Sequence, residues 1–189
     1  MSNKLTNKTW VMTWTRNHTN ELDGWHQDVT GEDISTLNGK DYYVAHSDVY
    51  GRRLLANILN YRGEEAKWGT IKDAIDAQLS GYPVEVKVLF CGVDRYAKSD
   101  TVLDQKKVND LKVYPGARVI YFYPDAETKT IGWRLFKVSD ILKYGVVKNE
   151  GGKKDSIDQE PSNKPLYYFP TSLSKRGVIK DIWLTGKKS

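Results

Sequence analysis

The amino-acid sequence predicts a mixed α/β (α+β) fold in which a central mixed β-sheet is flanked by helices. The run VEVKVLF at 84–90 alternates with strand periodicity. The segment 49–60 places its leucine and isoleucine side chains on one face at helical spacing. The predicted elements then follow in the order strands, helix, strand, helix, hairpin and strand, which is typical of a mixed sheet with helices packed on it.

The N-terminal part of the chain is predicted as strands separated by a loop. TWVMTWT at 9–15 is rich in β-branched and aromatic residues and predicts a strand. The segment 17–41 is polar and interrupted by glycines, which predicts a loop with one short helix. A second strand is predicted at 42–46, and the helix of 49–60 that follows it ends at Gly63.

The second half of the chain is predicted to alternate between helices and strands. A polar run rich in glycine and lysine predicts an exposed, flexible loop at about 148–164. We expect one domain over residues 1–189, with a core at about 41–147, because domains usually hold ~100–200 residues. The remaining predicted elements are a helix at 101–112, a strand at 118–123, its hairpin partner at 130–138, a short helix at 139–144 and strands at 166–169 and 177–184.

Composition and charge narrow the class of protein. The single cysteine, Cys91, excludes an intrachain disulfide and a cysteine-rich zinc site. No apolar stretch approaches the ~20 residues of a membrane span, and the N-terminus lacks the apolar core of a signal peptide. We therefore expect a cytoplasmic protein without a membrane partner. The net charge of +5 favours a phosphate polymer as the partner.

One segment, KDAIDAQLSGYPVEVK at 72–87, combines residues that suit phosphodiester chemistry. It contains Asp73, a turn-like SGYP, and a strand on which Glu85 and Lys87 point to the same face. Two carboxylates from neighbouring strands would form an oxygen site for a hard divalent ion. A lysine beside them would meet the attacking water or the scissile phosphate, as metal-assisted hydrolysis requires.

These residues resemble the PD-(D/E)xK nuclease superfamily, to which many restriction endonucleases belong. In that family an amphipathic helix precedes a hairpin with the Asp and the (D/E)xK strand, and a helix and a strand follow. The resemblance covers roughly residues 48–124 and implies a restriction-endonuclease-like fold and a Mg²⁺-dependent endonuclease that hydrolyses DNA. It implies that Asp73 and Glu85 bind Mg²⁺, that Lys87 is the catalytic lysine and that Gln105 is auxiliary. Because nucleases that cut both strands often dimerise, a homodimer is a further expectation.

Two alternatives remain open for this segment. Residues 68–79 also fit a helix with an apolar face, which would remove Asp73 from a hairpin. Asp48 or Asp94 would then be the candidate for the second acid. An ExK sequence on a strand also occurs where the polar pair only faces solvent, in which case no metal binds.

The sequence also contains candidate residues for nucleic-acid binding, and it allows a non-catalytic alternative to the nuclease. Arg52, Arg53, Lys106 and Lys107 are predicted to contact phosphates. The segment 113–138 resembles the barrel strands of PUA-like modules, with a hairpin that would expose aromatic side chains. That resemblance implies a non-catalytic reader of modified or single-stranded nucleic acid. A third alternative is an accessory protein that binds another protein.

Overall fold

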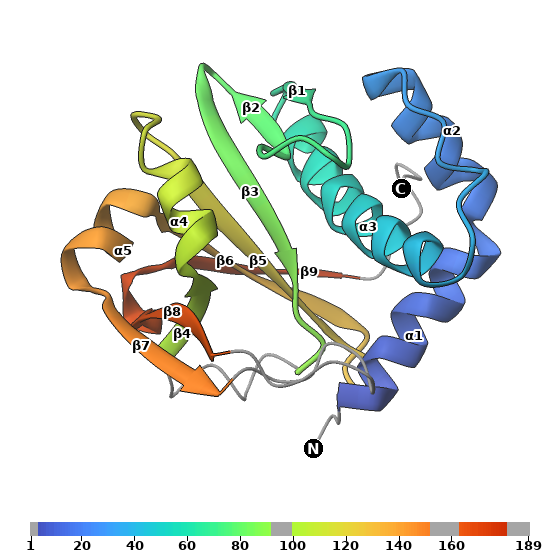
Figure 1. Cartoon of the computed structure of the whole chain (residues 1–189). Helices are drawn as coiled ribbons and strands as arrows, with labels where there is room; N and C mark the ends of the chain where they lie inside the picture. Colours follow the sequence, from blue (N-terminus) through green and yellow to red (C-terminus); the bar gives the residue numbers. More distant parts are fainter. Residues whose placement is uncertain (1–3, 92–99, 152–162, 181–189) are drawn as a thin grey trace.

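The computed structural model describes residues 4–91, 100–151 and 163–180. The N-terminal third is helical (Figure 1), with α1 at Lys4–Asn17, α2 at Thr19–Thr30 and α3 at Gly39–Tyr61. The strands predicted at 9–15 and 42–46 are therefore wrong. The segment predicted mainly as loop contains α2, and α3 begins well before residue 49.

Packing explains why α1 is a helix despite its β-branched and aromatic residues. Asn7, Val11 and Thr15 are buried and follow one another at four-residue spacing, which places them on one helix face. Trp10 and Trp14 pack against the same apolar cluster as Val11. The helix penalty of such residues is below about 0.7 kcal/mol each, whereas burying one large apolar side chain contributes about 1.5–3 kcal/mol.

A six-stranded mixed sheet lies at the centre, in the order β1-β2-β3-β5-β6-β9. Neighbouring strands are antiparallel except β3 and β5, which are parallel. The predicted strands at 84–90 and 118–123 and the hairpin partner at 130–138 are confirmed, as is the mixed α/β class. The strands are β1 Ala66–Trp68, β2 Ala77–Leu79, β3 Tyr82–Val88, β5 Arg118–Asp125, β6 Thr130–Lys137 and β9 Lys175–Lys180.

A second sheet of three strands, in the order β4-β8-β7, stands beside α4 and α5. The first part of the helix predicted at 101–112 is strand β4, and Asp104 caps the shorter α4 by accepting a hydrogen bond from Lys106 N at 2.8 Å. Strands also occupy both ends of the loop predicted at 148–164, whose middle lies outside the described residues. The elements are β4 Asp100–Asp104, α4 Gln105–Leu111, α5 Val138–Tyr144, β7 Val146–Gly151 and β8 Asn163–Pro170.

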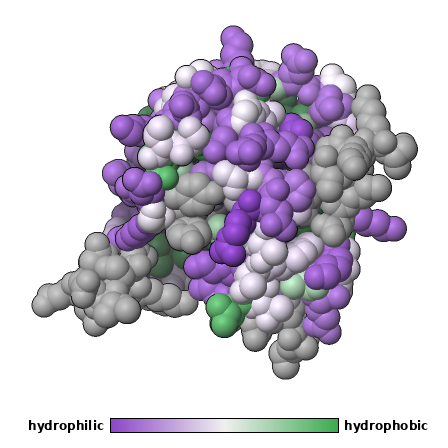
Figure 2. Space-filling view, turned by 90° about the vertical axis from the view of Figure 1, so that its right-hand side faces the viewer, coloured by the Kyte–Doolittle hydropathy of each residue, from purple (hydrophilic) through white to green (hydrophobic). Residues whose placement is uncertain are grey.

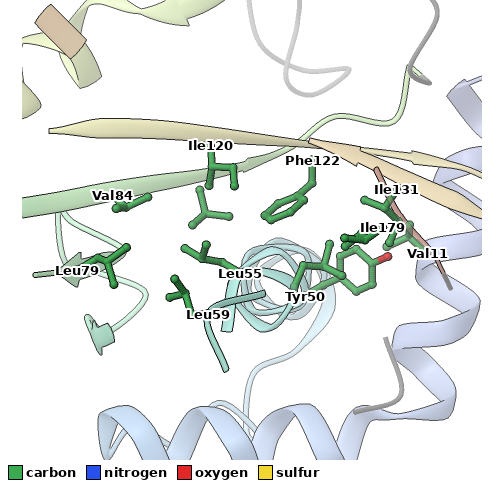
Figure 3. Close-up of a cluster of buried hydrophobic side chains, with 12 residues drawn as sticks. Val11, Tyr50, Leu55, Leu59, Leu79, Val84, Ile120, Phe122, Ile131 and Ile179 are labelled. Carbon is green, nitrogen blue, oxygen red and sulfur yellow. The ribbon is translucent and has the colours of Figure 1, made fainter. Parts of the chain in front are cut away.

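Both faces of the central sheet are covered (Figure 1). On one face, Tyr50, Leu55 and Leu59 of α3 meet side chains of the sheet, as Figure 3 shows. On the other face, α4, α5 and β8 pack against β5 and β6. Successive strand residues point to opposite faces, so Glu85 and Lys87 lie on the α4 side of β3, opposite Val84 and Val86.

Helix α3 lies unusually close to β3. A Cβ atom added to Gly51 would stand 2.7 Å from Val88 Cγ2 and 3.0 Å from Val86 Cγ1. Glycine at this position therefore allows the helix backbone to reach the strand. This close contact brings Asp48 and Arg52, which lie within one helical turn of Gly51, near β3.

The outer helices present a polar surface. The face on the side of α1 and α2 is mostly hydrophilic, with only scattered apolar residues (Figure 2). Among the helices that the structure describes, none combines the length and the apolar character needed to cross a membrane.

Candidate active site

The candidate site forms where β2 and β3 part. Their pairing begins at Ala77 opposite Val84, so the residue before β2 has left the regular ladder. That residue is Asp76, and its Oδ2 accepts a hydrogen bond from Val86 N at 2.7 Å. The carboxylate thus replaces a backbone partner of β3 and is held beside Glu85.

A buried arginine holds Asp76 from the other side. The Nη2 atom of Arg52, on α3, lies 2.8 Å from Asp76 Oδ1. The same guanidinium donates hydrogen bonds to the carbonyl oxygens of Gly69 and Thr70, which precede β2. Arg52 is only 1% exposed and its guanidinium binds protein groups, so in this structure it is not placed to contact a phosphate. Its contacts anchor Asp76 and the β1–β2 connection to α3.

Glu85 is the central acid of the site and is 2% exposed. Its Oε1 lies 2.9 Å from Lys87 Nζ and 3.3 Å from Lys107 Nζ, while its buried Oε2 has no hydrogen-bond partner. Burial raises the pKa of Glu85, and the negative charge of Asp76 raises it further, against the opposing effect of the lysines. The two lysines on Oε1 therefore do not fully offset the burial of Glu85 and the charge of Asp76.

Lys87 remains charged in this environment. Burial alone would lower its pKa, but the charge and hydrogen bond of Glu85, followed by the charges of Asp76 and Asp48, raise the pKa above its ordinary value. The side chain of Lys87 is 38% exposed, so its ammonium reaches solvent from the same face as Glu85. It is positioned to meet an anion that approaches the carboxylates.

Asp48 contributes a third negative charge, from α3. Its pKa is raised by desolvation first and by Asp76 second, although part of the residue remains open to solvent. It stands one helical turn before Arg52, on the same side of α3. Of the two acids named as alternatives to Asp73, Asp48 is therefore electrostatically part of the site, whereas Asp94 lies outside the described residues.

The structure corrects the assignment of Asp73. Residues 68–79 are not a helix, because β1 and β2 pair as a hairpin, but Asp73 lies in the exposed connection between these strands. Its carboxylate accepts a hydrogen bond from Thr70 N at 2.7 Å and so closes a local turn. The acid that acts on Glu85 is Asp76, three residues later. In the structure Ala77, Gln78 and Leu79 are buried, exposed and buried, but three residues give almost no periodic signal from which the start of β2 could have been predicted.

Of the other residues predicted to contact nucleic acid or to assist catalysis, those on α4 lie near the site and Arg53 does not. Lys107 is in the site, where it also donates a hydrogen bond to Ala74 O at 3.2 Å, and Lys106 is exposed on the same helix. Gln105 is the first residue of α4, but the side chain of α4 that reaches Glu85 is that of Lys107. Arg53 lies elsewhere, with its guanidinium 5.4 Å from the ring centre of Trp25.

The hairpin of β5 and β6, which was expected to expose aromatic side chains for nucleic-acid binding, does not form an exposed aromatic surface. The aromatic side chains of β5 and that of Phe136 on β6 are at most 1% exposed and belong to the core. Trp133 of β6 is half-buried, and Tyr114, in the turn before β5, is 41% exposed. Of the aromatic residues expected to be exposed over 113–138, Tyr114 is exposed, whereas those on the two strands of the hairpin are buried or half-buried.

The donors available for a divalent cation are carboxylate oxygens. Mg²⁺ prefers such oxygens, usually with one or two carboxylates and several waters. Glu85 Oε2 is available as a carboxylate ligand, since it is buried and has no hydrogen-bond partner. Both oxygens of Asp76 already accept hydrogen bonds, so Asp76 would share its carboxylate with a cation. Within the described part of the chain, no three His, Cys, Asp or Glu side chains are grouped closely enough to hold a metal ion.

The pKa of Glu85 leads to a first expected result. Without divalent cations, Glu85→Gln should be more stable than the wild type at pH 7. Because the folded state holds the proton of Glu85 more tightly than the unfolded state, stability falls as pH rises from the ordinary value of 4.5 through the raised pKa. Glutamine avoids this loss, which amounts to about 1.4 kcal/mol for each unit of pKa shift. Urea unfolding between about pH 4 and pH 8 measures the difference.

The control for this measurement is Glu65→Gln, which changes an exposed glutamate before β1 and should leave stability unchanged. Addition of Mg²⁺ should stabilise the wild type and not Glu85→Gln, because a ligand that binds only the folded state stabilises it. If Glu85→Gln were less stable than the wild type at pH 7, the ion pairs with Lys87 and Lys107 would dominate. Glu85 would then be a structural residue.

No protein-family model, curated protein sequence or solved structure matches this chain. The function must therefore be argued from the site itself, where Asp76, Glu85, Lys87 and Lys107 meet as β2 leaves β3 and Asp48 adds its charge from α3.

Proposed function

We propose that this chain is a divalent-cation-dependent nuclease whose catalytic site is built from Asp76, Glu85 and Lys87. The observation that carries the proposal is the carboxylate of Glu85. It is buried, its pKa is raised by burial and by Asp76, and its Oε2 lacks a partner beside a charged lysine. Perturbed acids of this kind, next to a charged partner, are characteristic of functional sites.

The order of elements around the site supports the proposal. Helix α3 precedes the β1–β2 hairpin, Asp76 stands at the start of β2, and β3 carries the ExK residues. Helix α4 and strand β5 follow, and β5 pairs with β3 in parallel. This is the order that the resemblance to the PD-(D/E)xK superfamily implies, with Asp76 in the place first given to Asp73.

The residues have separable roles in this proposal. Glu85, through Oε2, and Asp76 would hold Mg²⁺, with Asp48 as a further negative charge. A cation bound there would polarise the scissile phosphate and lower the pKa of a coordinated water. Lys87, on the same strand face as Glu85, holds a proton and a positive charge where the phosphate would approach. Arg52 keeps Asp76 oriented by binding its Oδ1.

The proposed substrate is DNA. The chain carries a net charge of +5, and Lys87, Lys106 and Lys107 reach the surface around the site. Lysines interact with phosphate as point charges and give affinity that depends on salt and little on sequence. This arrangement accounts for binding of the strand and assigns no recognition sequence.

The test is cleavage of plasmid and single-stranded DNA by the purified protein with Mg²⁺, Mn²⁺, Ca²⁺ or EDTA. We expect nicking with Mg²⁺ or Mn²⁺ and none with EDTA. Salt-dependent DNA binding with no cleavage under any cation would contradict the proposal and favour the non-catalytic reader. RNA of the same sequence, used as a parallel substrate, establishes which nucleic acid is cut.

A further inference from the structure

A cavity of about 420 Å³ opens beside the candidate site, between α4, β4, β5 and β8. Lys87 and Lys107 line one end of it, and both also contact Glu85 Oε1. The cavity thus adjoins the candidate site through these two lysines. Its volume falls within the ~300–1,000 Å³ typical of small-molecule sites.

The walls of this cavity differ in chemistry from one end to the other. The end near Glu85 has the ammonium groups of Lys87 and Lys107, whose side chains are 38% and 24% exposed. The rest of the wall combines apolar side chains, among them Val102 of β4 and Leu166 of β8, with the carboxylates of Asp104 and Asp110. Tyr121 supports that wall from beneath, where its hydroxyl donates a hydrogen bond to Val102 O at 3.1 Å.

In this structure Lys87 and Lys107 both form ion pairs with the same oxygen, Oε1 of Glu85. If Glu85 coordinates a cation, its carboxylate charge is shared with that cation, and its ion pairs with Lys87 and Lys107 become weaker. Two ammonium groups at the mouth of a partly apolar cavity then face a ligand with an anionic end and an apolar body. Lys106, exposed at the rim, adds a third positive charge.

We propose that this cavity is a nucleotide subsite, which binds the nucleotide next to the cleaved phosphate of the substrate strand. The phosphate lies toward Lys87 and Lys107, and the sugar and base lie against Val102 and Leu166. Asp110, at the cavity wall, offers a carboxylate that accepts hydrogen bonds from a base amino group or a sugar hydroxyl. This inference rests on the proposed nuclease function but concerns binding, which can be measured without cleavage.

Titration calorimetry with deoxyadenosine monophosphate, inorganic phosphate and deoxyadenosine tests the subsite. We expect the monophosphate to bind at least about tenfold more tightly than either fragment, because it alone uses both ends of the cavity. A short single-stranded oligonucleotide should displace the monophosphate and bind more tightly. Displacement by the oligonucleotide assigns the subsite to a substrate strand, and failure to displace the bound nucleotide overturns that assignment.

Two variants locate the binding, each with a matched control. Val102→Phe fills the cavity and Lys106→Glu reverses a rim charge, and each should weaken monophosphate binding about tenfold or more. Val178→Phe, on the exposed face of β9, and Lys112→Glu, exposed after α4, should bind like the wild type. Should Val102→Phe fail to fold, Lys106→Glu decides alone.

The outcomes separate the subsite from the catalytic proposal. Unchanged monophosphate binding in Val102→Phe and Lys106→Glu, or phosphate binding as tight as nucleotide binding, overturns the subsite while DNA cleavage can still occur. Cavity-dependent nucleotide binding in a protein that cuts no DNA refutes the nuclease and, with it, the assignment of the cavity to a cleaved strand, and leaves a nucleotide-binding cavity only.

Discussion

Replacing Lys87 by alanine is expected to lower the rate of cation-dependent DNA cleavage by about 10²–10⁴-fold, the range for a positioned proton donor or charge stabiliser. Negative charge grows on the phosphate oxygens as the bond breaks, and Lys87 is the charged group that shares the strand face of Glu85. The variant keeps both carboxylates, so Mg²⁺ should still raise its melting temperature. Initial rates of plasmid nicking and thermal unfolding with and without Mg²⁺ measure the two effects.

The matched variants separate catalysis from cation binding. Glu85→Gln should lose both cleavage and the Mg²⁺-dependent rise in melting temperature, because it removes the charge that would hold the cation. Lys143→Ala, an exposed lysine on α5, should cleave like the wild type. If Lys87→Ala and Glu85→Gln both retained wild-type cleavage, the activity would belong to a contaminant or to other residues, and the proposed site would be refuted.

Replacing Arg52 by methionine is expected to lower the free energy of unfolding by about 3–5 kcal/mol, the usual cost of breaking a buried ion pair by removing one partner. Asp76 would lose the cation on its Oδ1, and the carbonyls of Gly69 and Thr70 would lose their donor. Buried polar groups left without partners account for most of such losses. Urea unfolding at pH 7 measures the change.

The neighbouring arginine supplies the control. Arg53→Met removes a half-buried guanidinium that stacks on Trp25 and should cost no more than about 1 kcal/mol. The double variant Arg52→Met with Asp76→Asn should be more stable than the sum of the single effects, because the two residues interact directly. A loss below about 1 kcal/mol for Arg52→Met alone would show that Asp76 is held by Val86 and does not need the arginine.

The parts of the fold that could be predicted are those whose local pattern agrees with their packing. The alternation over 84–90 predicted β3 because Val84, Val86 and Val88 face the α3 core, whereas Glu85 and Lys87 lie on the opposite face. The helical stripe of 49–60 likewise predicted the buried half of α3. The strand predicted at 9–15 failed because its β propensity is worth less than the contacts that Val11 and its neighbours make as a helix.

The candidate site was predicted only in its strand component. Glu85 and Lys87 lie on one face of a strand, which follows from sequence separation alone. The choice between Asp73 and Asp76 depends on where β2 starts, and a strand of three residues gives almost no periodic signal. Arg52 was assigned to phosphate because a charged helix residue is usually exposed, and only its partner Asp76, distant in sequence, explains its burial.

The hydrogen bond from Val86 N to Asp76 makes one backbone nitrogen of the protein a spectroscopic probe of the acid cluster. An amide that donates to a carboxylate forms a stronger bond than one that donates to a neutral carbonyl. Its proton resonance should therefore respond to any charge placed beside Asp76. Since Val86 itself faces the α3 core, the observed nucleus belongs to the scaffold and lies outside the reacting groups. Occupancy of the site can thus be followed by nuclear magnetic resonance before any substrate is identified.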